Sequence, residues 1–215
     1  MFVPTTRTLP IALSIVVVLA TVGCDASVNK SIRVGDGESV SGSLSSVNGS
    51  ITIGANASVG GSAQTVNGSV RVGDGTSVED LTTVNGSIKL GGQVQVAGSL
   101  ESVNGSIESG GGTKVTGDIQ TINGRISLDG TEITGGIETT NGSITLAGGS
   151  RVAKDVRIEG INKNKRDAVT EILLTDGSVI EGDVIVEDGD RKVRVSIDGT
   201  SEVKGEVRGA EVTRL

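Results

Sequence analysis

Residues 84–102 read Val-Asn-Gly-Ser-Ile-Lys-Leu-Gly-Gly-Gln-Val-Gln-Val-Ala-Gly-Ser-Leu-Glu-Ser, and this unit of 19 residues, with small changes, builds almost the whole chain. Its opening motif returns at 47–50, 66–69 and 103–106, with relaxed versions at 28–31, 122–125 and 140–143. From Asn48 to Asn141 the asparagine recurs every 18 or 19 residues. A fixed period of this length is the signature of a stacked repeat architecture.

A longer register starts at the apolar residue three positions after the asparagine. Ile88 is followed by Leu90, Val96, Gly98 and Leu100, at offsets of two, eight, ten and twelve. The same offsets continue after the Asn-Gly pair is lost, and about nine extra residues precede the eighth copy. Nine copies result, starting at Ile32, Ile51, Val70, Ile88, Ile107, Ile126, Ile144, Ile172 and Val195.

Each copy is too short to bury a core alone, so the copies must stack. Their aliphatic residues alternate with polar ones, which is the period-2 pattern of strands with one face inward. The sequence therefore predicts an all-β, single-stranded parallel β-helix of about nine coils, roughly 43 Å tall at about 4.8 Å per coil. A sandwich or propeller would need antiparallel hairpins and longer periods. A left-handed helix of hexapeptides would repeat its apolar column every six residues, so we expect a right-handed coil.

The turn residues indicate how the corners are built. We expect the Asn-Gly pair to mark one corner in every coil, with glycine chosen for positive φ. Stacked asparagines can hydrogen-bond along the axis, as in amyloid ladders. Proline, which belongs on sheet edges, does not occur after Pro10.

The composition excludes several classes of chemistry. The chain has no His, Trp or Tyr and one Cys, and its net charge is −7. Histidine catalysis, His or multi-Cys metal sites, a disulfide framework and aromatic stacking are therefore not available. We expect no catalytic residue, metal or cofactor, and the acidity argues against a nucleic-acid partner.

The first 23 residues read as a targeting segment. An apolar run at 11–20, too short to span a bilayer comfortably, ends at the chain's single cysteine, Cys24. This arrangement resembles a bacterial lipoprotein signal, which implies cleavage before Cys24 and lipid anchoring on the extracytoplasmic, periplasmic side of a membrane. Asp25 is the candidate sorting residue, and it leaves the inner and outer membrane open. A plain secretory signal or an uncleaved anchor is the alternative. We expect a linker at 24–27 and the solenoid at 28–215.

Other motifs have a functional and a structural reading. Gly35-Asp36-Gly37 and its relative at 73–75 could be calcium loops, but the equivalent stretches at 54–56 and 91–93 lack aspartate, which favours turns. The Asn-Gly-Ser sequons are explained by the corner, and Glu79-Asp80 lacks the surrounding loops of a glycosidase groove. The basic insertion near 161–168 is either a solvated loop or a contact for an anionic partner such as cell-wall polymer or phospholipid; its candidate residues are Lys163, Lys165 and Arg166.

Residues 172–184, with the pieces at 115–119 and 203–207, resemble the β-helical core of bactofilins, which are polymer-forming bacterial cytoskeletal proteins. The resemblance implies a right-handed β-helix that associates end to end. The chain differs from that family in one respect: its first 23 residues predict export, whereas bactofilins are cytoplasmic. We therefore expect a non-catalytic scaffold lipoprotein of the cell envelope that self-associates. An envelope binding module for a cell-wall polymer or envelope protein is the alternative, and a polysaccharide-acting enzyme is the remote one.

The ends of the predicted rod carry a separate expectation. An uncapped solenoid end exposes unpaired strand edges. Only three residues separate Cys24 from the first repeat motif, so we expect a bare N-terminal end. The C-terminal segment carries Arg208, Glu211 and Arg214, which we expect to guard that end partly. A dimer or short oligomer paired through the N-terminal ends follows.

Overall fold

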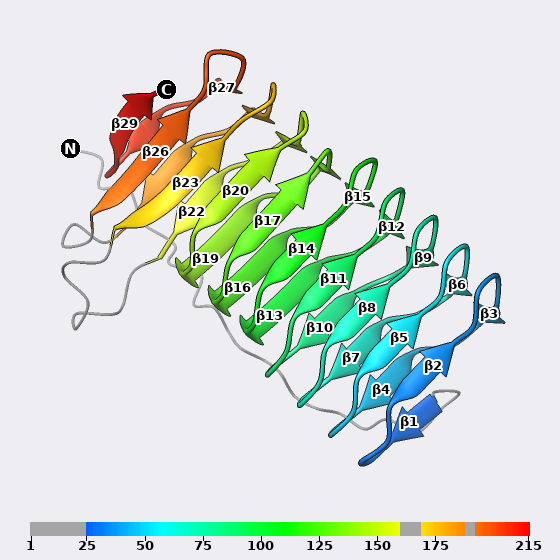
Figure 1. Ribbon diagram of the computed structural model, residues 1–215. Helices are drawn as coiled ribbons and strands as arrows, with labels where there is room; N and C mark the ends of the chain where they lie inside the picture. Colours follow the sequence, from blue (N-terminus) through cyan, green and yellow to red (C-terminus); the bar gives the residue numbers. More distant parts are fainter. Residues whose placement is uncertain (1–24, 160–168, 188–191) are drawn as a thin grey trace, which may run out of the picture.

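The computed structural model describes residues 25–159, 169–187 and 192–215, with side chains from residue 28 onward. Every regular element in these ranges is a short β-strand, and the strands pair in parallel into three sheets (Figure 1). Sheet A contains β1 (Asp25–Ser27), β4 (Leu44–Ser46), β7 (Ala63–Thr65), β10 (Leu81–Thr83), β13 (Leu100–Asn104), β16 (Ile119–Asn123), β19 (Ile137–Asn141), β22 (Val156–Ile158), β25 (Val184–Val186) and β28 (Val207–Arg208). Sheet B contains β2 (Ile32–Val34), β5 (Ile51–Ile53), β8 (Val70–Val72), β11 (Ile88–Leu90), β14 (Ile107–Ser109), β17 (Ile126–Asp129), β20 (Ile144–Ala147), β23 (Thr170–Leu174), β26 (Val193–Ile197) and β29 (Glu211–Arg214). Sheet C contains β3 (Ser39–Val40), β6 (Ser58–Val59), β9 (Ser77–Val78), β12 (Gln95–Val96), β15 (Lys114–Val115), β18 (Glu132–Ile133), β21 (Arg151–Val152), β24 (Val179–Ile180) and β27 (Glu202–Val203).

The chain visits the sheets in the order B, C, A, and one such passage is a coil. Coil 1 runs from β2 to β4 and coil 9 from β26 to β28. Equivalent residues of adjacent coils are direct partners: Ile88 pairs with Val70 on one side and with Ile107 on the other. The predicted register of nine copies and the parallel β-helix are confirmed.

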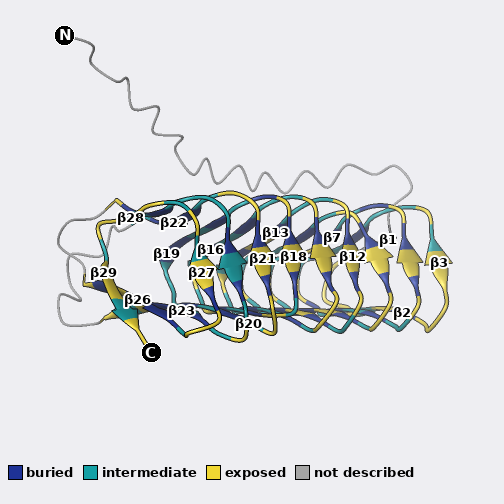
Figure 2. Cartoon of the chain, turned by 90° about the horizontal axis from the view of Figure 1, so that it is seen from above, coloured by how far each residue is buried: buried dark blue, intermediate teal, exposed yellow. Residues whose placement is uncertain are grey.

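The coil is right-handed, as expected. Sheet B faces the viewer in Figure 1, sheet C lies above it, and Figure 2 shows sheet A on the side opposite to sheet B. The chain thus turns from front to top to back while its coils advance from the right of the picture to the left. This combination of rotation and advance is the right-handed sense.

The core is a filled column of aliphatic side chains. Inward residues are buried from coil to coil, whereas the outward residues between them are partly or fully exposed (Figure 2). Along sheet B, Ile51, Val70, Ile88, Ile107, Ile126, Ile144, Ile172 and Val195 are all 0% exposed. Burying each such side chain contributes about 1.5–3 kcal/mol, so the repeated columns dominate the stability of the rod.

Buried hydroxyl groups accompany the aliphatic columns. Thr65 and Thr83 point inward at the end of their sheet A strands, and each donates to the carbonyl oxygen of a corner glycine in the preceding coil, at 2.7 and 2.8 Å. A second inward column donates in the same manner at the corner between sheets B and C, for example Thr76 to the Gly54 carbonyl at 2.7 Å. These bonds satisfy hydroxyls that would otherwise be costly to bury.

The predicted reason for glycine in the Asn-Gly pair is wrong. The corner glycines of this motif do not have positive φ. That conformation is common at the B–C corner, as at Gly37 (68°) and Gly75 (67°), and occurs at the A–B corner at Asn29 (60°) and Gly209 (76°). A Cβ on Gly86 would instead collide with the carbonyl oxygen of Gly68 in the preceding coil. The Asn-Gly corner requires glycine because successive coils approach too closely there for any side chain.

Two strands extend the sheets beyond the nine coils. β1 pairs with β4, so residues 25–27, which the sequence assigned to the linker, form a first strand of sheet A. β29 pairs with β26 and adds a tenth strand to sheet B, with Val212 opposite Val195. The rod therefore extends beyond its nine coils at both ends, by β1 in sheet A at the N-terminal end and by β29 in sheet B at the C-terminal end.

Candidate interaction surfaces

The sequence-predicted site residues lie mostly outside the described residues. Cys24, Lys163, Lys165 and Arg166 fall there, and Asp25 begins β1 without a described side chain. The basic insertion follows β22 and precedes β23, and a second, smaller insertion in the sequence, around residues 187–190, falls between β25 and β26. Both therefore interrupt the A–B corner, where the Asn-Gly motif stands in the earlier coils.

The asparagines of that corner form the predicted ladder. Each side-chain amide nitrogen donates to the amide oxygen of the preceding coil, for instance Asn67 to Asn48 at 2.7 Å and Asn104 to Asn85 at 3.0 Å. The ladder begins at Asn29, which accepts from Asn48 at 2.6 Å, and continues to Asn141. The sequon asparagines thus have a structural role along the axis.

The aspartates of the Gly-Asp-Gly turns also bond along the axis. Asp36 Oδ1 accepts the backbone N–H of Ala55 at 2.9 Å, and Asp74 Oδ1 accepts that of Gly92 at 2.8 Å. Each carboxylate therefore caps the next coil, as the turn interpretation requires. In the described ranges, no three His, Cys, Asp or Glu residues are grouped so as to hold a metal ion.

The C-terminal end of the rod is open. Val203 and Val207 are inward residues that remain half-buried in the last coil, and Val212 is 46% exposed. They line a hollow of about 500 Å³ with Ile197, rimmed by Arg214. The expectation of a partly guarded end did not anticipate this apolar surface.

The N-terminal end is less open, because β1 covers part of it. Leu44, directly under β1 in sheet A, is 1% exposed. In the other two sheets the first coil lacks a cover: Ile32 and Val40 are half-buried, whereas their partners Ile51 and Val59 are 0% and 3% exposed.

The outer side of sheet A carries an acidic face in coils 3–6, formed by Asp80, Glu101, Asp118 and Glu138. Asp80 and Asp118 stand at the corner before the strand and accept the backbone N–H of Ser99 and Gly136, both at 2.8 Å. Glu101 and Glu138 point outward from β13 and β19. Among the described residues of these coils, this face has no Lys or Arg.

Burial and nearby carboxyl groups raise the pKa values of the two glutamates of the acidic face. Burial, followed by the charge and hydrogen bond of Glu159, raises the pKa of Glu138 to about 7. Burial, followed by the charge of Asp80, raises the pKa of Glu101. The charge of Arg157, in coil 7, acts in the opposite direction and lowers the pKa of Glu138.

Cations enter this side of the rod only from coil 7 onward in the described part. Arg157 contacts Asp155 at 2.9 Å, and hydrogen bonds from the Asp183 backbone and Arg157 lower the pKa of Asp155. A shallow hollow of about 210 Å³ lies between these residues and the acidic face. Arg157, just before the insertion, is thus engaged in an ion pair.

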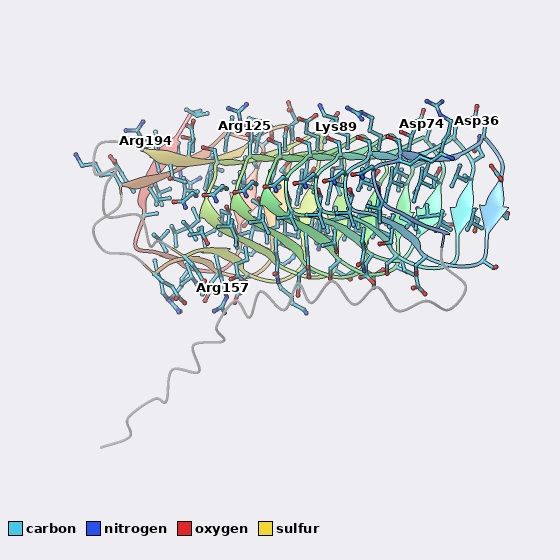
Figure 3. The ribbon with its side chains drawn as sticks, turned by 90° about the horizontal axis from the view of Figure 1, so that it is seen from below. Asp36, Asp74, Lys89, Arg125, Arg157 and Arg194 are labelled. Atoms are coloured by element: carbon cyan, nitrogen blue, oxygen red, sulfur yellow. The ribbon has the colours of Figure 1, made fainter. Side chains whose placement is uncertain are left out.

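The outer side of sheet B carries five cations, here called the basic face: Arg33, Arg71, Lys89, Arg125 and Arg194. The strands of this sheet also carry the acids Glu108, Asp129, Glu171 and Glu211, and Arg194 is the ladder partner of Glu171 and Glu211. All five cations are exposed. Lys89 pairs with Glu108 at 2.8 Å, whereas the four arginines take part in none of the ion pairs formed among the described residues. Lys89, Arg125 and Arg194 follow one long edge of the rod, and Arg157 lies on the opposite edge (Figure 3).

Both charged faces were missed by the sequence reasoning, although the repeat register contains them. The residues that follow the sheet B anchors include Arg33, Arg71, Lys89 and Glu108. Those that follow the sheet A anchors include Glu101, Glu138 and Arg157. Counting the charges along successive stretches of sequence does not separate the faces, because each coil contributes residues to all three sheets.

Comparison with known proteins does not assign the chain. No family model, no curated protein and no solved structure matches it. The described residues contain no helix of the length and apolarity needed to cross a membrane.

Proposed function

We propose that this protein is a non-catalytic scaffold of a bacterial cell envelope, anchored by lipid at Cys24 and assembled end to end into longer rods. The observation that carries the proposal is the open C-terminal end, where Val203, Val207 and Val212 leave part of the aliphatic column uncovered. The bactofilin-like sequence pattern supports the same direction of assembly.

Two physical terms favour stacking at the ends. Strand edges present unpaired N–H and C=O groups that another strand can satisfy, and three such edges meet at each end. The exposed valines add an apolar surface whose burial is favourable at about 25 cal/mol per Å². A second rod offers both complements at once, because its own end has the same three-sheet outline.

The anchor is inferred from the first 24 residues. An apolar run that ends at a unique cysteine provides both the export signal and the acceptor for the lipid. With the anchor at its N-terminus, the protein would present its C-terminal end away from the membrane, on the extracytoplasmic side.

The test compares two valine substitutions of equal exposure. Val212 lies in the open end and Val169 lies on the side of the rod, and both are 46% exposed. In the full chain dispersed in detergent, we expect Val212→Asp to abolish end-to-end association in sedimentation and electron microscopy, because a charge would be buried in the contact.

The control variant Val169→Asp should assemble like the parent protein. Strictly monomeric parent protein at high concentration would contradict the scaffold proposal. So would undiminished assembly of the Val212→Asp protein, because the open end would then have no part in it.

A further inference from the structure

We propose that the basic face of one rod docks on the acidic face of a second copy, so that rods associate side by side as well as end to end. The inference rests on the charges of sheets A and B and is independent of the ends. The occupant of each face is a second copy of this chain.

The two faces lie on opposite sides of the rod and carry opposite charge. Sheet A and sheet B flank the core on either side in Figure 2. In coils 3–6 the acidic face has four carboxylates and no described Lys or Arg, and the basic face has Arg71, Lys89 and Arg125 against Glu108 and Asp129. Opposite potentials on the two surfaces favour their encounter and disfavour contact between like faces.

The vertical positions of the charges also correspond. Arg71 is in coil 3, Lys89 in coil 4 and Arg125 at the entry to coil 6. In parallel rods without stagger these three cations lie at the heights of Asp80, Glu101 and Glu138, one from each of the same coils. The correspondence persists along the axis because both rods share the same rise of about 4.8 Å per coil.

The raised pKa values of Glu101 and Glu138 are consistent with this contact. Their charged forms are disfavoured by burial and by neighbouring carboxylates, so an arriving cation would stabilise them. The arginines of the basic face complement them, because a guanidinium stays charged and can bind a carboxylate in bidentate fashion.

The contact is heterologous, and it leaves one face of each rod free. A rod that docks through its sheet B still has a free sheet A, and this sheet can bind sheet B of the next rod. Contacts of this type do not close on themselves, so a flat raft of parallel rods grows sideways.

A second copy fits this pattern better than a linear polyanion or an anionic bilayer. A linear polyanion or an anionic bilayer can bind the basic face only, whereas a second copy also supplies cations to the acidic face. Each copy carries one acidic face and one basic face, and the charges of the two faces lie in the same coils.

The test uses charge reversal on either face of the full chain, dispersed in detergent. The basic-face variant carries Arg71→Glu and Arg125→Glu, and the acidic-face variant carries Glu101→Lys and Glu138→Lys. A control variant carries Lys114→Glu and Arg151→Glu on sheet C, which changes the net charge as much as the basic-face variant does. Circular dichroism and urea unfolding establish that each protein is folded.

Sedimentation is measured in about 0.02 M and about 0.5 M salt, because screening separates charge contacts from apolar ones. We expect parent and control to associate in low salt and to lose this association in high salt. Each face variant alone should associate at least about tenfold more weakly. An equimolar mixture of the two face variants should regain association, since each then offers the other a complementary surface.

Three results would overturn the proposal: monomeric parent protein in low salt, no recovery in the mixture, or an acidic-face variant that associates like the parent. The last result would assign the basic face to a different anionic partner. The Val212→Asp protein distinguishes the two modes of assembly, because it should keep the salt-sensitive association.

Discussion

Ile119 provides the sharpest test of the inward register. It is 0% exposed in the middle of sheet A, and it pairs with Leu100 in the preceding coil and Ile137 in the following one. Ile119→Ala removes three carbon atoms, which amounts to about 2.4 kcal/mol of transfer free energy at about 0.8 kcal/mol per methylene group.

The cavity adds to this loss. The strands above and below Ile119 are held by their ladder hydrogen bonds, so the site cannot collapse onto the missing atoms. We therefore expect Ile119→Ala to lower the free energy of unfolding by about 3–5 kcal/mol. Gln120→Ala, at the adjacent outward position, should stay within about 0.5 kcal/mol of the parent.

Urea unfolding followed by far-UV circular dichroism measures both variants, because the chain has no Trp or Tyr for fluorescence. Coils contact only their neighbours, so the variant can also unfold locally before the ends of the rod. If Gln120→Ala proved as damaging as Ile119→Ala, the assignment of inward and outward faces would be refuted. A loss below about 1 kcal/mol for Ile119→Ala would show that the site repacks.

Three further predictions follow from other features. Cys24→Ala should abolish labelling by a fatty-acid analogue and release the protein from membranes; undiminished labelling would end the lipoprotein interpretation. Gly86→Ala should destabilise the rod strongly, since its Cβ would meet the Gly68 carbonyl, whereas Gly111→Ala, with open space around its Cβ, should melt close to the parent in thermal unfolding. The pKa of Glu138 is about 7 in the folded state against an ordinary 4.5, so the stabilising proton is lost as pH rises through this interval. The melting temperature should therefore fall from about pH 5 to 8 in the parent and less in Glu138→Gln; equal pH slopes would show that this carboxyl group titrates normally.

The inward columns could be predicted from the sequence because burial follows a local rule. Ile88, Leu90, Val96 and Leu100 alternate with polar residues, and the alternation alone assigns each to a face. The asparagine ladder was also predictable, since a polar residue at a fixed offset must stack on its copies.

Other features depend on the distance between coils, which a repeat period does not contain. The glycine of the Asn-Gly pair was assigned to positive φ, whereas close approach to the preceding carbonyl explains it. The inward position of Thr65 was missed because a hydroxyl reads as polar until its acceptor, the Gly49 carbonyl, is located one coil away. The pairing of β1 and β29 likewise depends on edges that the nine copies leave free.

The same geometry explains why the outward columns are the place to look for function. The inward columns consist of aliphatic residues and small hydroxyl residues, of which Thr139 has no hydrogen-bond partner among the described residues, so their composition hardly changes along the rod. Each outward position belongs to one coil and touches only its neighbours above and below, so its charge can change without disturbing the core. Charges placed in this way inherit the spacing of the coils, and two parallel rods have the same spacing. A surface ion pair is individually weak, but a column of pairs in common register sums several of them on one rigid face. The regularity that stabilises a single rod therefore also provides the means by which two rods can recognise each other.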